Sequence, residues 1–241
     1  MAKTRKLIVD VLADASRVTS EFAKIGKSSG TLEDKFKKLG KSLALGMGAA
    51  AAGVAVLGKG AIDAAMEAQS VQRKVEAVIK ATGGAANVTG KQVDKLAGSM
   101  SMKVGVDDEV IKAGLSMMLT FKGIRNETGK GNKIFDRAAA AMMDLGSVFG
   151  SSDAAAMQLG KALNDPVKGI GALKKAGVDF TQAQKDQIKK MQESGDLLGA
   201  QKIILGEIEA QVGGTAAASA TAGDKMKVAF GEVQEKIGGA L

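Results

Sequence analysis

The sequence predicts an all-α protein in which a long N-terminal helix precedes a compact multi-helix domain. The chain has 1 proline in 241 residues, so little in it stops a helix. Aromatic residues make up only 3%, and much of the apolar share is alanine, which suits close helix–helix contact better than a thick core. Helix-capping patterns and glycine breaks recur along the chain at helix-length intervals.

The first two segments are residues 1–30 and residues 31–84. The first is basic and opens with a strand-like run over 6–12, followed by a helix from about 15 to 27. The second reads as one long helix ending at Gly83-Gly84, and its large apolar residues recur at spacings of four, three and four: Leu32, Phe36, Leu39 and Leu43.

Smaller residues continue this seam at the same spacing. A seam of small residues lets partner helices approach closely, as in a tight coiled coil or a membrane bundle. We therefore expect self-association, with these residues as candidates for helix packing or membrane contact: Leu43, Gly46, Ala50, Gly53 and Leu57.

The run Ser42–Gly58 is uncharged and lies between Lys41 and Lys59. A bilayer core needs about 20 apolar residues, and this run is short and rich in Ala and Gly. Two interpretations stay open: a helix packed against its own copies, or a segment that inserts into a host membrane only under some conditions.

Residues 85–214 read as a compact helical domain, because capping signals punctuate them closely. Thr89 with Gln92 and Thr181 with Gln184 are capping boxes, and Asp165-Pro166 is an N-cap before a first-turn proline. We expect helices at about 89–103, 107–121, 134–150, 152–163, 166–177, from 181, and 196–212. The core candidates are Leu96, Val110, Leu115, Leu119, Phe121, Phe135, Met142, Leu145, Leu159, Leu163, Leu173, Phe180, Ile188, Leu198, Ile203 and Leu205.

Residues 215–241 read as a C-terminal helix, from about 221 to 236, that leads into a continuation of the chain. Met residues number 12 and fall mostly within helical patterns. Methionine fills irregular gaps in cores and also suits adaptable interfaces, so both a core role and a binding face remain open for them.

Several classes of chemistry are excluded by composition. With no Cys and no His, the chain cannot build thiolate nucleophiles, His-based triads or Cys/His zinc sites. A glycosidase would use a pair of acidic residues in a cleft, normally with aromatic side chains that stack on the sugar rings, and the chain has no Trp or Tyr for this. The glycine-rich run 129–133 lacks the spacing of a phosphate loop, and Gly169-Ile170-Gly171 is better explained by tight helix packing. We expect no catalytic residue, no cofactor and no metal ion.

The net charge of +8 is concentrated at the N-terminus. Residues 1–41 carry ten Lys and Arg against five Asp and Glu, a net +5. Such an end can make weak, non-specific contact with DNA or anionic lipid, or can be a solvated helix face.

Several blocks together resemble the N-terminal region of the tail length tape measure proteins of tailed bacteriophages. They occur at 88–97, 103–114, 118–124, 160–166, 177–181, 211–218 and 231–238, so the resemblance spans about 85–241. The two most specific blocks supply the family-motif residues: Gly160, Lys161, Ala162, Leu163, Asn164, Asp165 and Pro166, then Gly177, Val178, Phe180 and Thr181.

The resemblance implies a non-enzymatic helical protein that fills the lumen of the tail tube and sets its length. It implies contacts with the tail tube protein, tail assembly chaperones and tail tip proteins. It also implies a place in the host cytoplasm during assembly, in the virion tail afterwards, and at the host envelope on infection, where such proteins help DNA to pass.

The length of the chain departs from this picture. Fully helical, 241 residues span about 360 Å, and a folded domain shortens that reach. We therefore expect either the N-terminal portion of a longer protein or a truncated remnant of one. The alternative function is a membrane-active, pore-forming or permeabilising protein that inserts Ser42–Gly58. A cell-wall hydrolase is a third, disfavoured by the lack of His, Cys, Trp and Tyr.

Overall fold

The computed structural model describes residues 51–175 and 177–239, and across them the fold is all-α, without a β-strand. The chain divides into two units, Met1–Val56 and Leu57–Leu241. Apart from residues 51–56, the described residues all belong to the second unit. The strand-like run and the helix expected in residues 1–30 lie outside the described residues.

The long helix α3 (Ala51–Ala81) is the described part of the helix predicted over 31–84, and it ends where the sequence indicated. Gly83 and Gly84 both adopt left-handed backbone conformations, with φ of 67° and 70°. Glycine adopts this conformation without steric cost, so this pair stops the helix and turns the chain towards α4.

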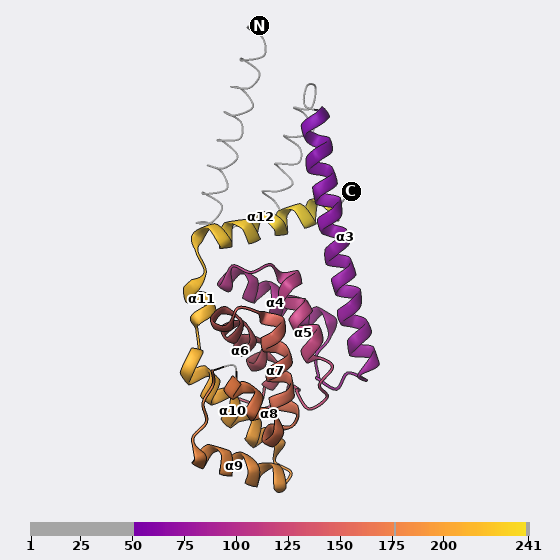
Figure 1. The fold of residues 1–241 in the computed structure, drawn as a ribbon. Helices are drawn as coiled ribbons and strands as arrows, with labels where there is room; N and C mark the ends of the chain where they lie inside the picture. The colour runs from indigo at the N-terminus through magenta and orange to yellow at the C-terminus, as the bar shows by residue number, and fades with distance from the viewer. Residues whose placement is uncertain (1–50, 176, 240–241) are drawn as a thin grey trace. The chain divides into compact units, whose positions relative to one another are not determined.

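Within the described ranges, nine further helices follow α3 in the order shown in Figure 1. They are α4 (Gly90–Val104), α5 (Asp108–Met118), α6 (Ile134–Phe149), α7 (Ser152–Asn164), α8 (Pro166–Lys175), α9 (Gln182–Glu193), α10 (Leu197–Val212), α11 (Thr215–Ser219) and α12 (Ala222–Gly238).

Helices α6 and α7 form the centre of the packing. Helix α6 contacts α4, α5, α7, α10 and α11, and α7 contacts α5, α6, α8 and α10. Their buried faces supply the largest enclosed side chains of the core, including Phe135, Met142, Leu145, Leu159 and Leu163. Helix α10 returns from α9 to cover α6, while α12 lies against α4 (Figure 1).

Most of the expected core is confirmed. Leu115, Leu119, Phe135, Met142, Leu145, Leu159, Leu163, Leu173, Phe180, Ile188 and Leu205 are buried, and Leu96, Phe121, Leu198 and Ile203 pack against them partly exposed. The prediction for Val110 is wrong, because its side chain is 48% exposed while its neighbour Ile111 is fully buried. Two adjacent β-branched residues leave the helix register ambiguous from sequence, and α5 turns the second one inwards.

Two boundaries also differ from the expectation. Helix α5 ends at Met118 rather than near Phe121, because the chain turns there through hydrogen bonds from the amides of Thr120 and Phe121. Residues 215–241 hold two helices rather than one: the short α11 contacts α6 and α4, and α12 contacts α4.

Candidate functional site

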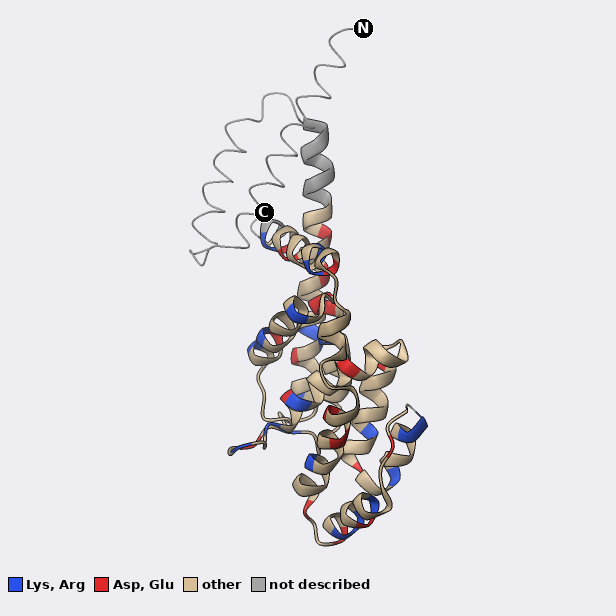
Figure 2. Cartoon of the chain, turned by 90° about the vertical axis from the view of Figure 1, so that its left-hand side faces the viewer, with Lys and Arg blue, Asp and Glu red and all other residues tan. Residues whose placement is uncertain are grey.

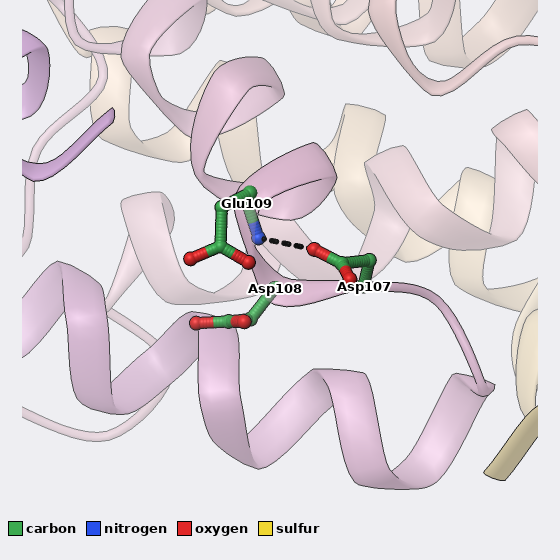
Figure 3. A group of neighbouring side chains, drawn as sticks. All are labelled: Asp107, Asp108 and Glu109. Atoms are coloured by element: carbon green, nitrogen blue, oxygen red, sulfur yellow. Dashed lines mark hydrogen bonds between the residues drawn. The ribbon is translucent and has the colours of Figure 1, made fainter. Parts of the chain in front are cut away.

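The turn between α4 and α5 gathers three consecutive acidic residues (Figure 3). Asp107 caps α5, since its Oδ1 accepts a hydrogen bond of 3.1 Å from the Glu109 amide. Asp108 and Glu109 occupy the first turn, where the helix dipole favours negative charge. Both are buried, unlike Asp107, which is exposed.

Lys112 places its ammonium among these acids. Its Nζ lies 2.7 Å from Asp108 Oδ2, 3.0 Å from Asp94 Oδ1 and 3.3 Å from Glu109 Oε1. The residue is only 3% exposed. One ammonium with three donors thus meets three carboxyl groups from two helices, which ties α4 to α5 through a buried cation.

The protonation states follow from this burial. Burial raises the pKa of Glu109 to about 9, and hydrogen bonding to Asp107 and Asp108 adds to the rise. Burial by itself would lower the pKa of Lys112, but its hydrogen bonds to Asp108 and Asp94 outweigh that and raise it above the ordinary value. Lys112 therefore stays charged at neutral pH, while the buried site favours the protonated form of Glu109. We call Asp94, Asp108, Glu109 and Lys112 the Lys112 cluster.

An open groove of about 680 Å³ exposes one side of this cluster. Helix α12 lines it with Glu232, Glu235 and Lys236, and α3 adds Arg73. Figure 2 shows basic and acidic residues mixed on the helix that ends near the C-terminus. The groove is therefore charged but has no dominant sign.

The acids of the turn are also close enough to hold a cation, since one carboxylate oxygen from each of Asp107, Asp108 and Glu109 lies within 4.8 Å of the others. Two of these groups already bind Lys112, and a metal ion would have to compete with that ammonium. This arrangement is best suited to a structural role, in which buried ion pairs link the packed helices α4 and α5.

The family-motif residues form a second region, at the joint between α7 and α8. Asp165 ends α7 and Pro166 begins α8. Gln192 of α9 spans this joint: its Nε2 donates to Asp165 Oδ1 at 3.0 Å, and its Oε1 accepts from the Val167 amide at 2.9 Å. Gln192, followed by the ammonium of Lys168, holds the pKa of Asp165 below its usual range.

Beside this joint, the loop after α5 is tied to the end of α7. Asn164 Oδ1 accepts from the Gly123 amide at 3.1 Å. Gln201 of α10, 2% exposed, donates from Nε2 to the carbonyls of both Gly123 and Leu163 at 2.8 Å. These bonds satisfy backbone groups that the joint would otherwise leave unpaired.

The rest of the 160–166 block packs closely. Gly160 lies directly under the Phe121 ring, and Ala162 lies against Gly169 of α8, so a larger residue at either glycine would collide. Leu163 and Ala162 are fully buried, and Lys161 is exposed.

The 177–181 block ends α8 and starts α9. The Gly177 amide bonds Lys174 O at 3.0 Å and the Val178 amide bonds Leu173 O at 3.0 Å, which is the Schellman pattern, with Gly177 left-handed at φ 84°. Val178 and Phe180 enter the core. Thr181 caps α9 in the predicted capping box with Gln184.

The side chains of the small-residue seam lie outside the described part of the structure. Leu43, Gly46 and Ala50 lie outside the described residues, and Gly53 and Leu57 belong to α3, where the structure describes the backbone but not their side chains. The seam therefore stays a prediction. Of the helices in the described ranges, none combines the length and apolar character needed to cross a membrane.

Sequence reasoning missed Lys112, Gln192 and Gln201. For Lys112 a signal existed, because Asp108 and Glu109 precede it by four and three residues, the spacing of ion pairs on one helix face. The two glutamines carried none, since their partners lie 25 to 78 residues away in the chain.

Comparison of the chain with protein-family models, with curated proteins and with solved structures finds no match.

Proposed function

We propose that this chain is a non-enzymatic structural component of a phage tail, the N-terminal portion of a tape measure protein. The observation that carries the proposal is the placement of the two most specific family-motif blocks. Each contains a joint between consecutive helices, α7–α8 and α8–α9, and its residues cap, turn or pack. Motif residues of a structural protein are expected to do this work, whereas those of an enzyme would converge on a groove.

The charged groove also suits a structural role better than catalysis. Its buried ammonium, that of Lys112, is committed to three carboxyl groups, and the chain has no His or Cys to act as base or nucleophile. In this proposal the chain contacts its own copies, the tail tube protein, the assembly chaperones and the tail tip. Exposed apolar side chains on two helices offer surfaces for such contacts: Ile62 and Met66 on α3, Met226 and Phe230 on α12.

The test is tail length in the phage that encodes the chain. In-frame removal of residues 31–58 should shorten the tail by about 42 Å, and duplicating them should lengthen it by the same amount, if this segment spans the tube as a helix with a rise of 1.5 Å per residue. Electron microscopy of negatively stained particles measures both.

A matched control separates the effect of the length of this segment from the effect of its amino-acid sequence. Replacing residues 31–58 with an Ala-rich helical sequence of equal length should leave tail length unchanged. Tails of normal length from both the deletion and the duplication would contradict the proposal.

A further inference from the structure

Helix α12 is held outside the main core. Among its described side chains, Val228 is the apolar one that is buried, and it does not belong to the core cluster formed by the other helices. Met226 and Phe230 are 71% and 51% exposed. Because apolar burial on α12 is small, charged contacts have more influence on whether this helix stays docked.

Acidic side chains of α12 line the same groove as acidic side chains of α4 and α5. Glu232 and Glu235 line the groove together with Asp94 of α4 and Asp108 of α5, and the charge of Asp108 acts on Glu235. The cations on this surface are Arg73 of α3, Lys95 of α4, Lys112 of α5 and Lys236 of α12 itself. The charge of Asp107 also acts on Glu235, and Glu109 lies beside Asp107 and Asp108.

Of these cations, Lys112 offsets the charge of Glu235 only in part. Lys112 already binds three carboxyl groups, and Lys236 lies 3.6 Å from Glu232 Oε2. Within the described part of the chain, the Glu235 carboxylate has no ion-pair partner. An ionised Glu235 would therefore sit among carboxylates in a half-buried place.

We propose that α12 is a pH-dependent latch, which docks on α4 and α5 while Glu235 carries a proton and is released when Glu235 ionises. Burial, the charge of Asp108 and the charge of Glu232 raise the pKa of Glu235 from 4.5 to about 7 in the docked state, against a smaller lowering by Lys112. The released helix exposes Glu235 to water, where the pKa returns towards 4.5.

The direction follows from proton linkage. Between these two pKa values the docked state binds more protons than the released state. The stabilisation of docking by this proton therefore decreases as pH rises from 4.5 and is fully lost above about 7. Because each unit of pKa difference changes an equilibrium tenfold, the ratio of docked to released protein should fall at least about tenfold between pH 5 and pH 8.5.

The connection to α11 allows such movement. Ser219 ends α11, Ala220 is extended with ψ 116°, and α12 begins at Ala222. Thr221 and Asp224 bond each other at the start of α12: the Thr221 amide donates to Asp224 Oδ2 at 3.0 Å, and the Asp224 amide donates to Thr221 Oγ1 at 3.1 Å. These bonds are internal to α12, so the helix can leave its neighbours without losing its cap. The inference goes beyond the proposed function and does not depend on it.

The experiment measures the distance between α12 and α4 at two pH values. Because the chain has no cysteine, Lys103→Cys on α4 and Lys227→Cys on α12 give two unique labelling sites, both exposed. Spin labels there, read by double electron–electron resonance, should give one short distance at pH 5 and a longer, broader distribution at pH 8.5. Circular dichroism checks that the other helices persist at both values.

Variants isolate the group responsible. Glu235→Gln and Glu235→Ala remove the ionisable carboxyl, and both should keep α12 docked at pH 8.5. Glu193→Gln, an exposed carboxylate on α9, should behave like the parent protein. An unchanged distance from pH 5 to 8.5 in the parent protein would overturn the proposal, and so would equal switching in Glu235→Gln.

Discussion

Two glycines of α8 look alike in sequence but differ in role. A methyl group on Gly169 would lie 2.6 Å from the Ala162 nitrogen and 2.7 Å from the Lys161 carbonyl oxygen, whereas one on Gly171 would meet nothing within 4 Å. The backbones of α7 and α8 approach each other at Gly169, and backbone atoms cannot move aside as the end of a side chain can. The packing interpretation of this glycine pair therefore holds at the first position.

Alanine substitutions at these two positions should change stability in opposite directions. Gly169→Ala should lower the free energy of unfolding by about 3 kcal/mol, since the collision forces α7 and α8 apart. Gly171→Ala should raise it by up to about 1 kcal/mol, since alanine favours the helix and finds open space. Urea unfolding followed by circular dichroism measures both, and a loss at Gly171 equal to that at Gly169 would refute the argument.

Residues that act locally are the ones that a sequence reveals. Thr181 and Gln184 are three apart, so their pairing is visible in a short window. Gln201 bonds Gly123 across 78 residues, and nothing in its own neighbourhood indicates that. The Lys112 cluster is intermediate between these cases. The spacing of Lys112 from its partners on α5 is visible in the sequence, but Asp94 belongs to another helix.

At the scale of helices, ends are more predictable than faces. The capping boxes at Thr89 and Thr181 both form as the sequence indicates, because a cap depends on a few consecutive residues. The buried face of α5 depends instead on where α4 and α7 pack against it. That is why the sequence pattern favours Val110 for the core when Ile111 belongs there.

The cap of α9 gives a test of this view. Thr181→Ala removes the side-chain oxygen that accepts the Gln184 amide at 3.2 Å, and should cost about 1 kcal/mol of stability. Thr181→Ser keeps that oxygen and should stay within about 0.5 kcal/mol of the parent protein. Thermal unfolding of the two variants checks this, and equal losses would show that the methyl group rather than the hydrogen bond matters.

In the molecule as a whole, α10 packs against all four of the helices that directly precede it in the chain. It contacts α6, α7, α8 and α9, and it buries Ala200, Ile204, Leu205 and Ile208. Helix α12 contributes far less to the core, since Val228 lies outside the core cluster. The two C-terminal elements should therefore differ sharply in their importance for folding.

Two truncations test that difference. A chain ending at Ala220 lacks α12 and should still unfold cooperatively. A chain ending at Gly195 also lacks α10, and burying each large aliphatic side chain contributes about 1.5–3 kcal/mol, so its loss approaches the whole stability of a typical domain. Its thermal melt should show no cooperative transition. A sharp transition in the shorter chain would mean that α4–α9 form a core alone.

The late position of α10 has a consequence for synthesis. The ribosome must translate past Val212 before the side of α6 that meets α10 can be covered. At about 5–20 residues per second, several seconds separate the appearance of α6 from that of its cover. During that interval the nascent chain presents an apolar helix face to every other polypeptide nearby, so the rate of translation between α6 and α10 helps to decide how much of the protein reaches its native fold.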